Sequence, residues 1–166
     1  MTNPLTPYIK AEVHTAALGF TQKVAIIEYP EYILHYQGLD SIDEGCDTRL
    51  LTAIAPCLVP EYDYFIVVYS MADMNKDLDV YNALILHELG HIHYPATGIV
   101  DVEIEAACDA HAVKYGYGQA LKNLLRTGTE IFFMGLTPEE VEEAKALPEI
   151  QLLTDCLNER IRRLNV

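Results

Sequence analysis

Two histidines and a glutamate near the middle of the chain have the spacing of a metal site. His87, Glu88 and His91 form an HExxH motif, which reads HELGH over 87–91. On an α-helix, positions i and i+4 lie about 40° apart around the axis and about 6 Å apart along it. Both imidazoles can therefore reach one metal ion, while the carboxylate of Glu88 can take a proton from a water that the metal activates. The motif predicts metal-assisted hydrolysis with Glu88 as the general base.

The motif requires a third ligand further along the chain, because a catalytic zinc ion usually has three protein ligands and one open position for water. Glu105 is the best candidate. Asp109 follows it on the same helical face, where it can accept a hydrogen bond from the free ring nitrogen of a liganding histidine. Glu103 and His111 point away from this face on an ideal helix, so they are weaker candidates that stay open as alternatives.

Small residues accompany these candidate ligands on both predicted helices. Gly90 lies inside the motif, and alanines surround Glu105 at positions 106, 107 and 110. Because such residues add little bulk, two helices that carry them can approach each other closely. The sequence therefore predicts that the two helices pack directly against one another.

Together these residues resemble the signature of the gluzincin class of zinc metallopeptidases. HELGH at 87–91 is followed by EAACD at 105–109, which is similar to the ExxxD pattern on the second helix of minigluzincins and of small phage-borne or bacterial neutral zinc peptidases. The resemblance covers about Asp79 to Tyr117. It implies a Zn²⁺ ion bound by His87, His91 and Glu105, with Glu88 as the general base and Asp109 supporting a liganding histidine.

The resemblance has further implications for the substrate site. It implies an edge strand before the first helix that aligns an extended peptide through main-chain hydrogen bonds, a place that Tyr62–Tyr69 fits. The related metzincin pattern is excluded, because this chain has Tyr94 and Thr97 where a glycine and a third histidine are required. A donor that stabilises the oxyanion is also expected. Four side chains stay open for that role: Tyr115, Tyr117, His111 and His93.

Charge and length limit the partners and the number of domains. The chain of 166 residues has a formal net charge of -14, which repels phosphate backbones and anionic membrane surfaces. We therefore expect no binding to nucleic acid or membrane, while a peptide or protein substrate is what the resemblance implies. The length fits a single zincin-like domain over residues 1–166. The sequence does not indicate an oligomeric state.

The N-terminus and the cysteines bear on the cellular compartment. The first residues lack a basic stretch followed by an apolar core, and no apolar run approaches the roughly 18 residues needed to cross a bilayer. A cytoplasmic location is the expectation. The cysteines lack CxxC spacing, which favours reduced thiols over a zinc knuckle or disulfides. They are Cys46, Cys57, Cys108 and Cys156.

Short elements are predicted before the motif and helices from the motif onward. The first part is predicted to contain a helix from Thr6 toward Leu18, a strand over Lys23–Tyr29, an extended piece over Tyr32–Tyr36, a helix over Asp47–Ala55 and a strand over Tyr62–Tyr69. The second part is predicted to contain a helix over Val80–Tyr94 with Asp77 or Asp79 as N-cap, a helix over Val102–Tyr115 closed by Gly116, a helix opened by a capping box at Thr137 and Glu140, and a last helix from Pro148 to near Leu164.

These elements predict an α+β fold with a helical C-terminal half. A small twisted, mostly antiparallel sheet would pack on the active-site helix, as in zincin-like proteins. The predicted function is a zinc-dependent metallopeptidase. The alternative is a catalytically inactive, zinc-stabilised binding or regulatory protein with the same fold.

Overall fold

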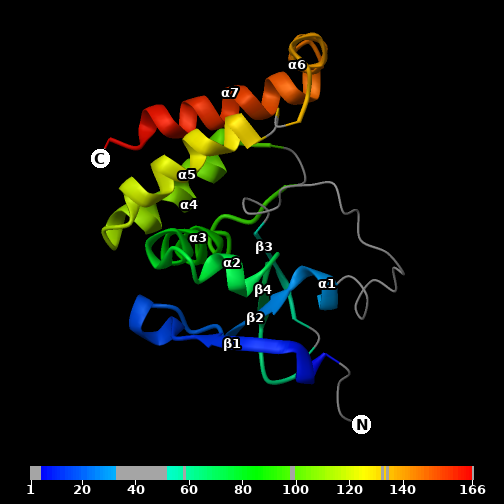
Figure 1. Cartoon of the computed structure of the whole chain (residues 1–166). Coiled ribbons are helices and arrows are strands. Elements are labelled where there is room, and N and C mark those ends of the chain that lie inside the picture. The colour runs from blue at the N-terminus through cyan, green and yellow to red at the C-terminus, as the bar shows by residue number, and fades with distance from the viewer. Residues whose placement is uncertain are drawn as a thin grey trace. The chain divides into compact units, whose positions relative to one another are not determined.

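The computed structural model describes residues 5–32, 52–57, 59–97, 100–131, 133 and 135–165. They form two compact units, one within Met1–Asp77 and one within Leu78–Val166. The first unit holds the strands and the second is built of helices (Figure 1). The predicted α+β class and the helical C-terminal half are therefore confirmed, whereas the assignment of one domain stays a prediction.

The first unit contains a mixed, four-stranded sheet in its described residues. The strands are β1 (Ile9–Val13), β2 (Val24–Glu28), β3 (Ala53–Pro56) and β4 (Tyr64–Val68), in the order β1-β2-β4-β3. The two central strands, β2 and β4, run parallel, while both outer pairings are antiparallel. The central strands are continuous runs of buried, mainly β-branched residues, a composition typical of parallel strands that are covered on both faces.

The expected edge strand at Tyr62–Tyr69 is wrong in one respect. A strand does form there, but β4 pairs with both β2 and β3 and so lies inside the sheet. The edges are β1 and β3. The apolar run of β4 belongs to an interior strand, whereas β1 alternates with exposed positions at Lys10 and Glu12.

Two predicted helices in the first unit are also wrong. The region from Thr6 toward Leu18 forms a short 3₁₀ turn (η1, Thr6–Tyr8), strand β1 and a second 3₁₀ turn (η2, Thr15–Leu18). Pairing of β1 with β2 overrides the helical start signals. Ala53–Ala55, the described end of the helix expected over Asp47–Ala55, lies in β3, and residues 47–51 lie outside the described part.

The strands predicted at Lys23–Tyr29 and Tyr62–Tyr69 are confirmed, each a little shorter than expected. A helical turn, α1 (Tyr29–Tyr32), follows β2, and the rest of the extended piece expected over Tyr32–Tyr36 lies outside the described residues. A second short helix, α2 (Met71–Met74), is capped by Ser70. One core cluster covers a face of the sheet with Leu5, Ala25, Ile27, Tyr32, Val59, Phe65 and Val67.

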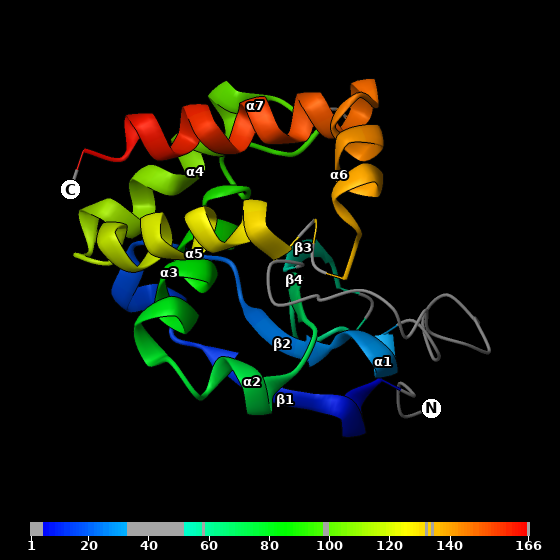
Figure 2. The same cartoon turned by 45° about the horizontal axis from the view of Figure 1, so that its top comes forward.

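The second unit packs five helices together: α3 (Leu78–Gly90), α4 (Val102–Lys114), α5 (Gly118–Ile131), α6 (Pro138–Lys145) and α7 (Pro148–Arg163). α4 contacts both α3 and α7, and α5 contacts all three of these helices. Figure 2 shows α7 lying over α4, and α7 contacts both α4 and α5. The predicted capping box is present, because Thr137 accepts from the backbone of Glu140 and the Glu140 carboxylate accepts from the backbone of Thr137.

The motif helix ends earlier than predicted. α3 stops at Gly90, and a turn follows in which the amide of His91 donates to the carbonyl of Glu88. The amides of Ile92 and His93 likewise donate to carbonyls three residues back, at Leu89 and Gly90, so the chain tightens into a turn before Pro95. His91 is therefore the first residue of a tight turn and does not belong to the helix.

Two other sequence-based expectations concern membranes and cysteines. None of the described helices combines the length and apolar character needed to cross a membrane. Cys57, Cys108 and Cys156 are free thiols, as predicted, and Cys46 lies outside the described residues.

Candidate metal centre

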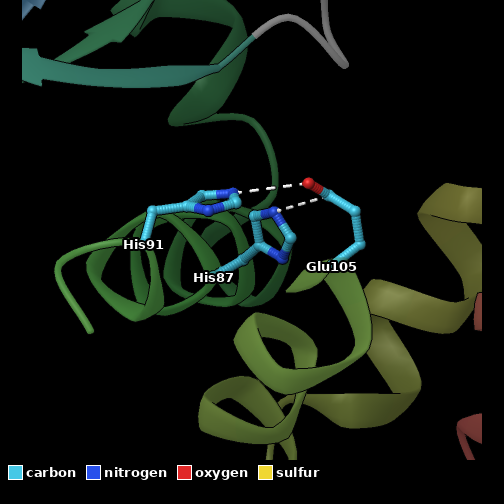
Figure 3. A group of neighbouring side chains, drawn as sticks. All are labelled: His87, His91 and Glu105. Carbon is cyan, nitrogen blue, oxygen red and sulfur yellow. Dashed lines mark ion pairs between the residues drawn. The ribbon is translucent and has the colours of Figure 1, made fainter. Parts of the chain in front are cut away.

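His87, His91 and Glu105 bring their ligand atoms together at one place in the second unit. Figure 3 shows the two imidazole rings, from α3 and the turn after it, facing the carboxylate of Glu105 on α4. His87 Nε2 lies 3.3 Å from Glu105 Oε2, and His91 Nε2 lies 3.6 Å from Glu105 Oε1. One candidate ligand atom from each residue lies within 4.8 Å of the others. Within the described part of the chain, this is the one such group of three.

The spacing of these atoms fits a zinc ion. Ligand atoms bound about 2.0–2.2 Å from zinc at tetrahedral angles are about 3.3–3.6 Å apart. The two nitrogen–oxygen separations of 3.3 and 3.6 Å agree with that value. Two imidazoles and one carboxylate also form a donor set that catalytic zinc sites use. The three residues can therefore hold zinc through both Nε2 atoms and the carboxylate.

Each liganding imidazole is oriented through its other ring nitrogen. His87 Nδ1 lies 2.7 Å from Asp109 Oδ1, and His91 Nδ1 lies 3.0 Å from the carbonyl oxygen of Tyr94. An ionised carboxylate and a backbone carbonyl can only accept, so both Nδ1 atoms must donate. Each Nε2 is thereby assigned as the atom available to a metal. The early end of α3 contributes directly, because the turn places the Tyr94 carbonyl beside His91.

The start of α4 positions Glu105. Asp101 caps this helix by accepting from the backbone amides of Glu103 and Ile104 at 2.9 and 3.4 Å. Glu105 consequently lies in the first turn of α4, where the partial positive charge of the helix end favours a carboxylate. Its side chain is 23% exposed, while those of His87 and His91 are 7% and 8% exposed. The carboxylate is thus the more accessible member of the ligand set.

Arg160 from α7 completes the site. Its Nε and one Nη atom donate to the two oxygens of Asp109 at 2.8 and 2.7 Å, forming a bidentate pair. Its other Nη atom lies 3.3 Å from Glu105 Oε2. The positive charge of the guanidinium therefore offsets the negative charges of the Asp109 and Glu105 carboxylates.

The ionisable groups of the centre, His87, Glu105 and Asp109, strongly affect one another's pKa values. Burial lowers the pKa of His87, but its hydrogen bonds to Asp109 and Glu105 outweigh this effect and raise the pKa to about 9. Burial raises the pKa of both acids. The hydrogen bonds from Arg160 to Asp109 and from His87 to Glu105 nevertheless hold both of those pKa values below their usual range. At neutral pH a proton therefore occupies Nε2 of His87, which is the atom that a metal needs.

Glu88 lies on α3 between the two histidines of the motif. It is 4% exposed, and its charge contributes to raising the pKa of His87. A buried carboxylate next to the ligand set is suited to accept and return a proton in a place shielded from bulk water.

The alternative ligands have other contacts. Glu103 is bound by Arg163 at 2.6 and 2.9 Å, and its side chain is 72% exposed, so it does not belong to the cluster. His111 stacks on His93, with ring centroids 6.2 Å apart. The choice of an oxyanion donor stays open.

A cavity of about 320 Å³ adjoins the site and has Glu105 and Arg160 in its wall. The remainder of its lining is mainly apolar and comes from the segment before α4 and from α7: Ala96, Val100, Leu153, Cys156 and Leu157. Sequence analysis did not find this cavity, and it did not find Arg160. The basic end of the last helix, with arginines at 160, 162 and 163, is a signal for an ion pair, but it does not indicate which arginine faces inward.

Comparisons with known proteins leave the family of this chain open. No family model, no curated protein and no solved structure matches it. The geometry of the site is therefore the basis on which a function can be inferred.

Proposed function

We propose that this protein is a zinc-dependent metallopeptidase. The observation that carries the proposal is the convergence of His87 Nε2, His91 Nε2 and the Glu105 carboxylate, with both imidazoles oriented by hydrogen bonds from Nδ1. The gluzincin-like motif pair and a zincin-like fold belong to this proposal. So does a cytoplasmic protein or peptide as substrate.

In this proposal each residue has a defined task. His87, His91 and Glu105 hold the metal, and Asp109 fixes the ring of His87 through the 2.7 Å hydrogen bond. Zinc, when bound, polarises the peptide carbonyl and makes water more acidic. Glu88 accepts the proton of the attacking water and delivers it to the departing amine. The cavity next to Glu105 offers space for an apolar side chain of the peptide.

The alternative is a zinc-stabilised protein that binds a partner without hydrolysis. The low exposure of both histidines is the observation that favours this alternative, since structural zinc sites are enclosed. Structural sites, however, usually have four protein ligands, and the described residues supply three. Three protein ligands, which would leave a zinc ion one position for water, support the peptidase.

The test combines metal analysis with Glu88→Gln. Purified protein should bind about one zinc per chain, and the Gln variant should retain that zinc while losing cleavage of fluorescently labelled casein. Glu142→Gln, an exposed change on α6, is the matched control and should cleave normally. Cleavage by the Glu88→Gln variant at the wild-type rate would refute the mechanism. Zinc binding without hydrolysis of casein or of a broad peptide library would support the alternative.

A further inference from the structure

Arg160 is placed unlike the other arginines of α7. Its side chain is 11% exposed, and all three guanidinium nitrogens face the two acids of the centre. Arg162, by contrast, is 72% exposed and bonds only Glu159 on its own helix in the described structure. The question is therefore what the buried guanidinium does for the site.

We propose that Arg160 is a positioning residue of the metal centre, so that zinc affinity depends on its bidentate pair with Asp109. This inference rests on the proposed function, because it assumes that His87, His91 and Glu105 bind zinc. It assigns to the C-terminal helix a role that the two motif segments alone do not contain.

The contacts argue for positioning rather than for substrate binding. Nε and one Nη atom form the planar fork that matches both oxygens of Asp109, and the other Nη faces Glu105. Each guanidinium nitrogen has a carboxylate oxygen within 3.3 Å, which favours a positioning role over peptide binding. The fork fixes the orientation of Asp109, and Asp109 in turn fixes His87.

The positive charge of Arg160 has the opposite effect on zinc affinity. The direction of the change in affinity therefore distinguishes positioning from charge. A guanidinium 3.3 Å from Glu105 repels a divalent cation at the same carboxylate. If charge dominated, removal of Arg160 would tighten zinc binding. If positioning dominates, removal leaves Asp109, whose side chain is 3% exposed, without its main partner and weakens zinc binding.

Arg163 provides a matched control for helix docking. It lies one turn after Arg160 and also joins α7 to α4, through two bonds to Glu103 at 2.9 and 2.6 Å. Glu103 does not belong to the ligand group. Loss of Arg163 therefore weakens the same helix contact without touching the metal centre.

The experiment compares the wild type with Arg160→Gln, Arg160→Lys and Arg163→Gln in the full chain. Zinc affinity is measured by competition with a chromophoric chelator, and the visible spectrum of bound Co²⁺ reports the ligand geometry. We expect affinity to fall about 10- to 100-fold in Arg160→Gln. Arg160→Lys should also bind more weakly, because an ammonium lacks the fork. Arg163→Gln should match the wild type in affinity and spectrum.

Each result decides a separate point. If the wild type binds no zinc, the proposed function fails and this inference with it. If the wild type binds zinc and both Arg160 variants bind it as tightly or more tightly, the inference alone is overturned. Circular dichroism of the metal-free proteins checks that each variant folds. If Arg160→Gln does not fold, the zinc affinity of Arg160→Lys tests the inference instead. An Arg163→Gln loss equal to that of Arg160→Gln would also overturn it, since docking rather than positioning would then set the affinity.

Discussion

Gly90 on α3 lies directly against Cys108 on α4. A Cβ atom added to Gly90 would be 2.7 Å from the Cα of Cys108, which is closer than unbonded carbons approach in proteins. Each of these residues is followed by a residue of the centre, His91 after Gly90 and Asp109 after Cys108. This close approach of the two helices thus occurs beside the candidate metal centre.

We expect Gly90→Ala to weaken both the fold and the zinc site. The added methyl group must push α4 away, at a cost of about 1–3 kcal/mol in the free energy of unfolding, and the shift separates Glu105 from the histidines. Urea unfolding of the metal-free protein and zinc titration measure the two effects. The control is Gly19→Ala, where the backbone φ is +82°. An added Cβ there would have no atom of a non-neighbouring residue within 4 Å, so backbone strain arises without a change at the metal centre. Wild-type zinc affinity in Gly90→Ala would contradict the prediction.

A pair of acid-to-amide variants identifies the third ligand. Glu105→Gln removes the charged oxygen that lies 3.3 Å from His87 Nε2, so zinc should no longer remain bound through gel filtration. Glu103→Gln changes an exposed residue paired with Arg163 and should retain one zinc per chain. Native mass spectrometry gives the stoichiometry. The opposite pattern would make Glu103 the ligand.

Zinc binding at neutral pH should release a proton from His87. The pKa of this residue is about 9 in the metal-free centre, so zinc must displace a proton from Nε2. Calorimetry in two buffers of different ionisation enthalpy measures the number released. Asp109→Asn removes the first of the hydrogen bonds that raise this pKa and should lower the number. Equal heats in both buffers for the wild type would show that no proton is exchanged.

The same group should make the metal-free protein less stable in alkaline solution. The folded pKa of about 9 lies above the ordinary value of 6.5, so the folded state holds a proton that the unfolded state has lost. The contribution to stability is complete below pH 6.5 and disappears as the pH rises through about 9. Urea unfolding of wild type and His87→Asn across this range isolates the effect. If the difference between the two proteins does not shrink with rising pH, the charged pair does not stabilise the fold.

The candidate ligand group could be predicted from sequence because the spacing within each pair of residues is local. His87 and His91 are separated by about one helical turn, and the four-residue interval from Glu105 to Asp109 survives in α4. Even so, the HExxH pattern does not reveal that α3 ends at Gly90, and the turn that follows gives His91 its partner at Tyr94.

Other features depend on contacts between distant segments. Arg160 and Asp109 are 51 residues apart in sequence, so no periodicity connects them. The region around Ile9 has signals for a helix start, but its pairing with β2 makes it a strand. The strand at Tyr64–Val68 was predicted, whereas its interior position depends on β3, which sequence analysis had assigned to a helix. Contacts between segments that are distant in sequence determine all three features.

The position of Arg160 on α7 also determines when the site can be completed during synthesis. A growing chain acquires both histidines, Glu105 and Asp109 before its ribosome reaches the codon for Arg160. Until α7 is made and docks on α4, two acids that end up largely buried lack their guanidinium partner. If Arg160 positions the centre as proposed, the centre is completed only after residue 160 is made, and nascent chains interrupted earlier carry the candidate ligands without Arg160.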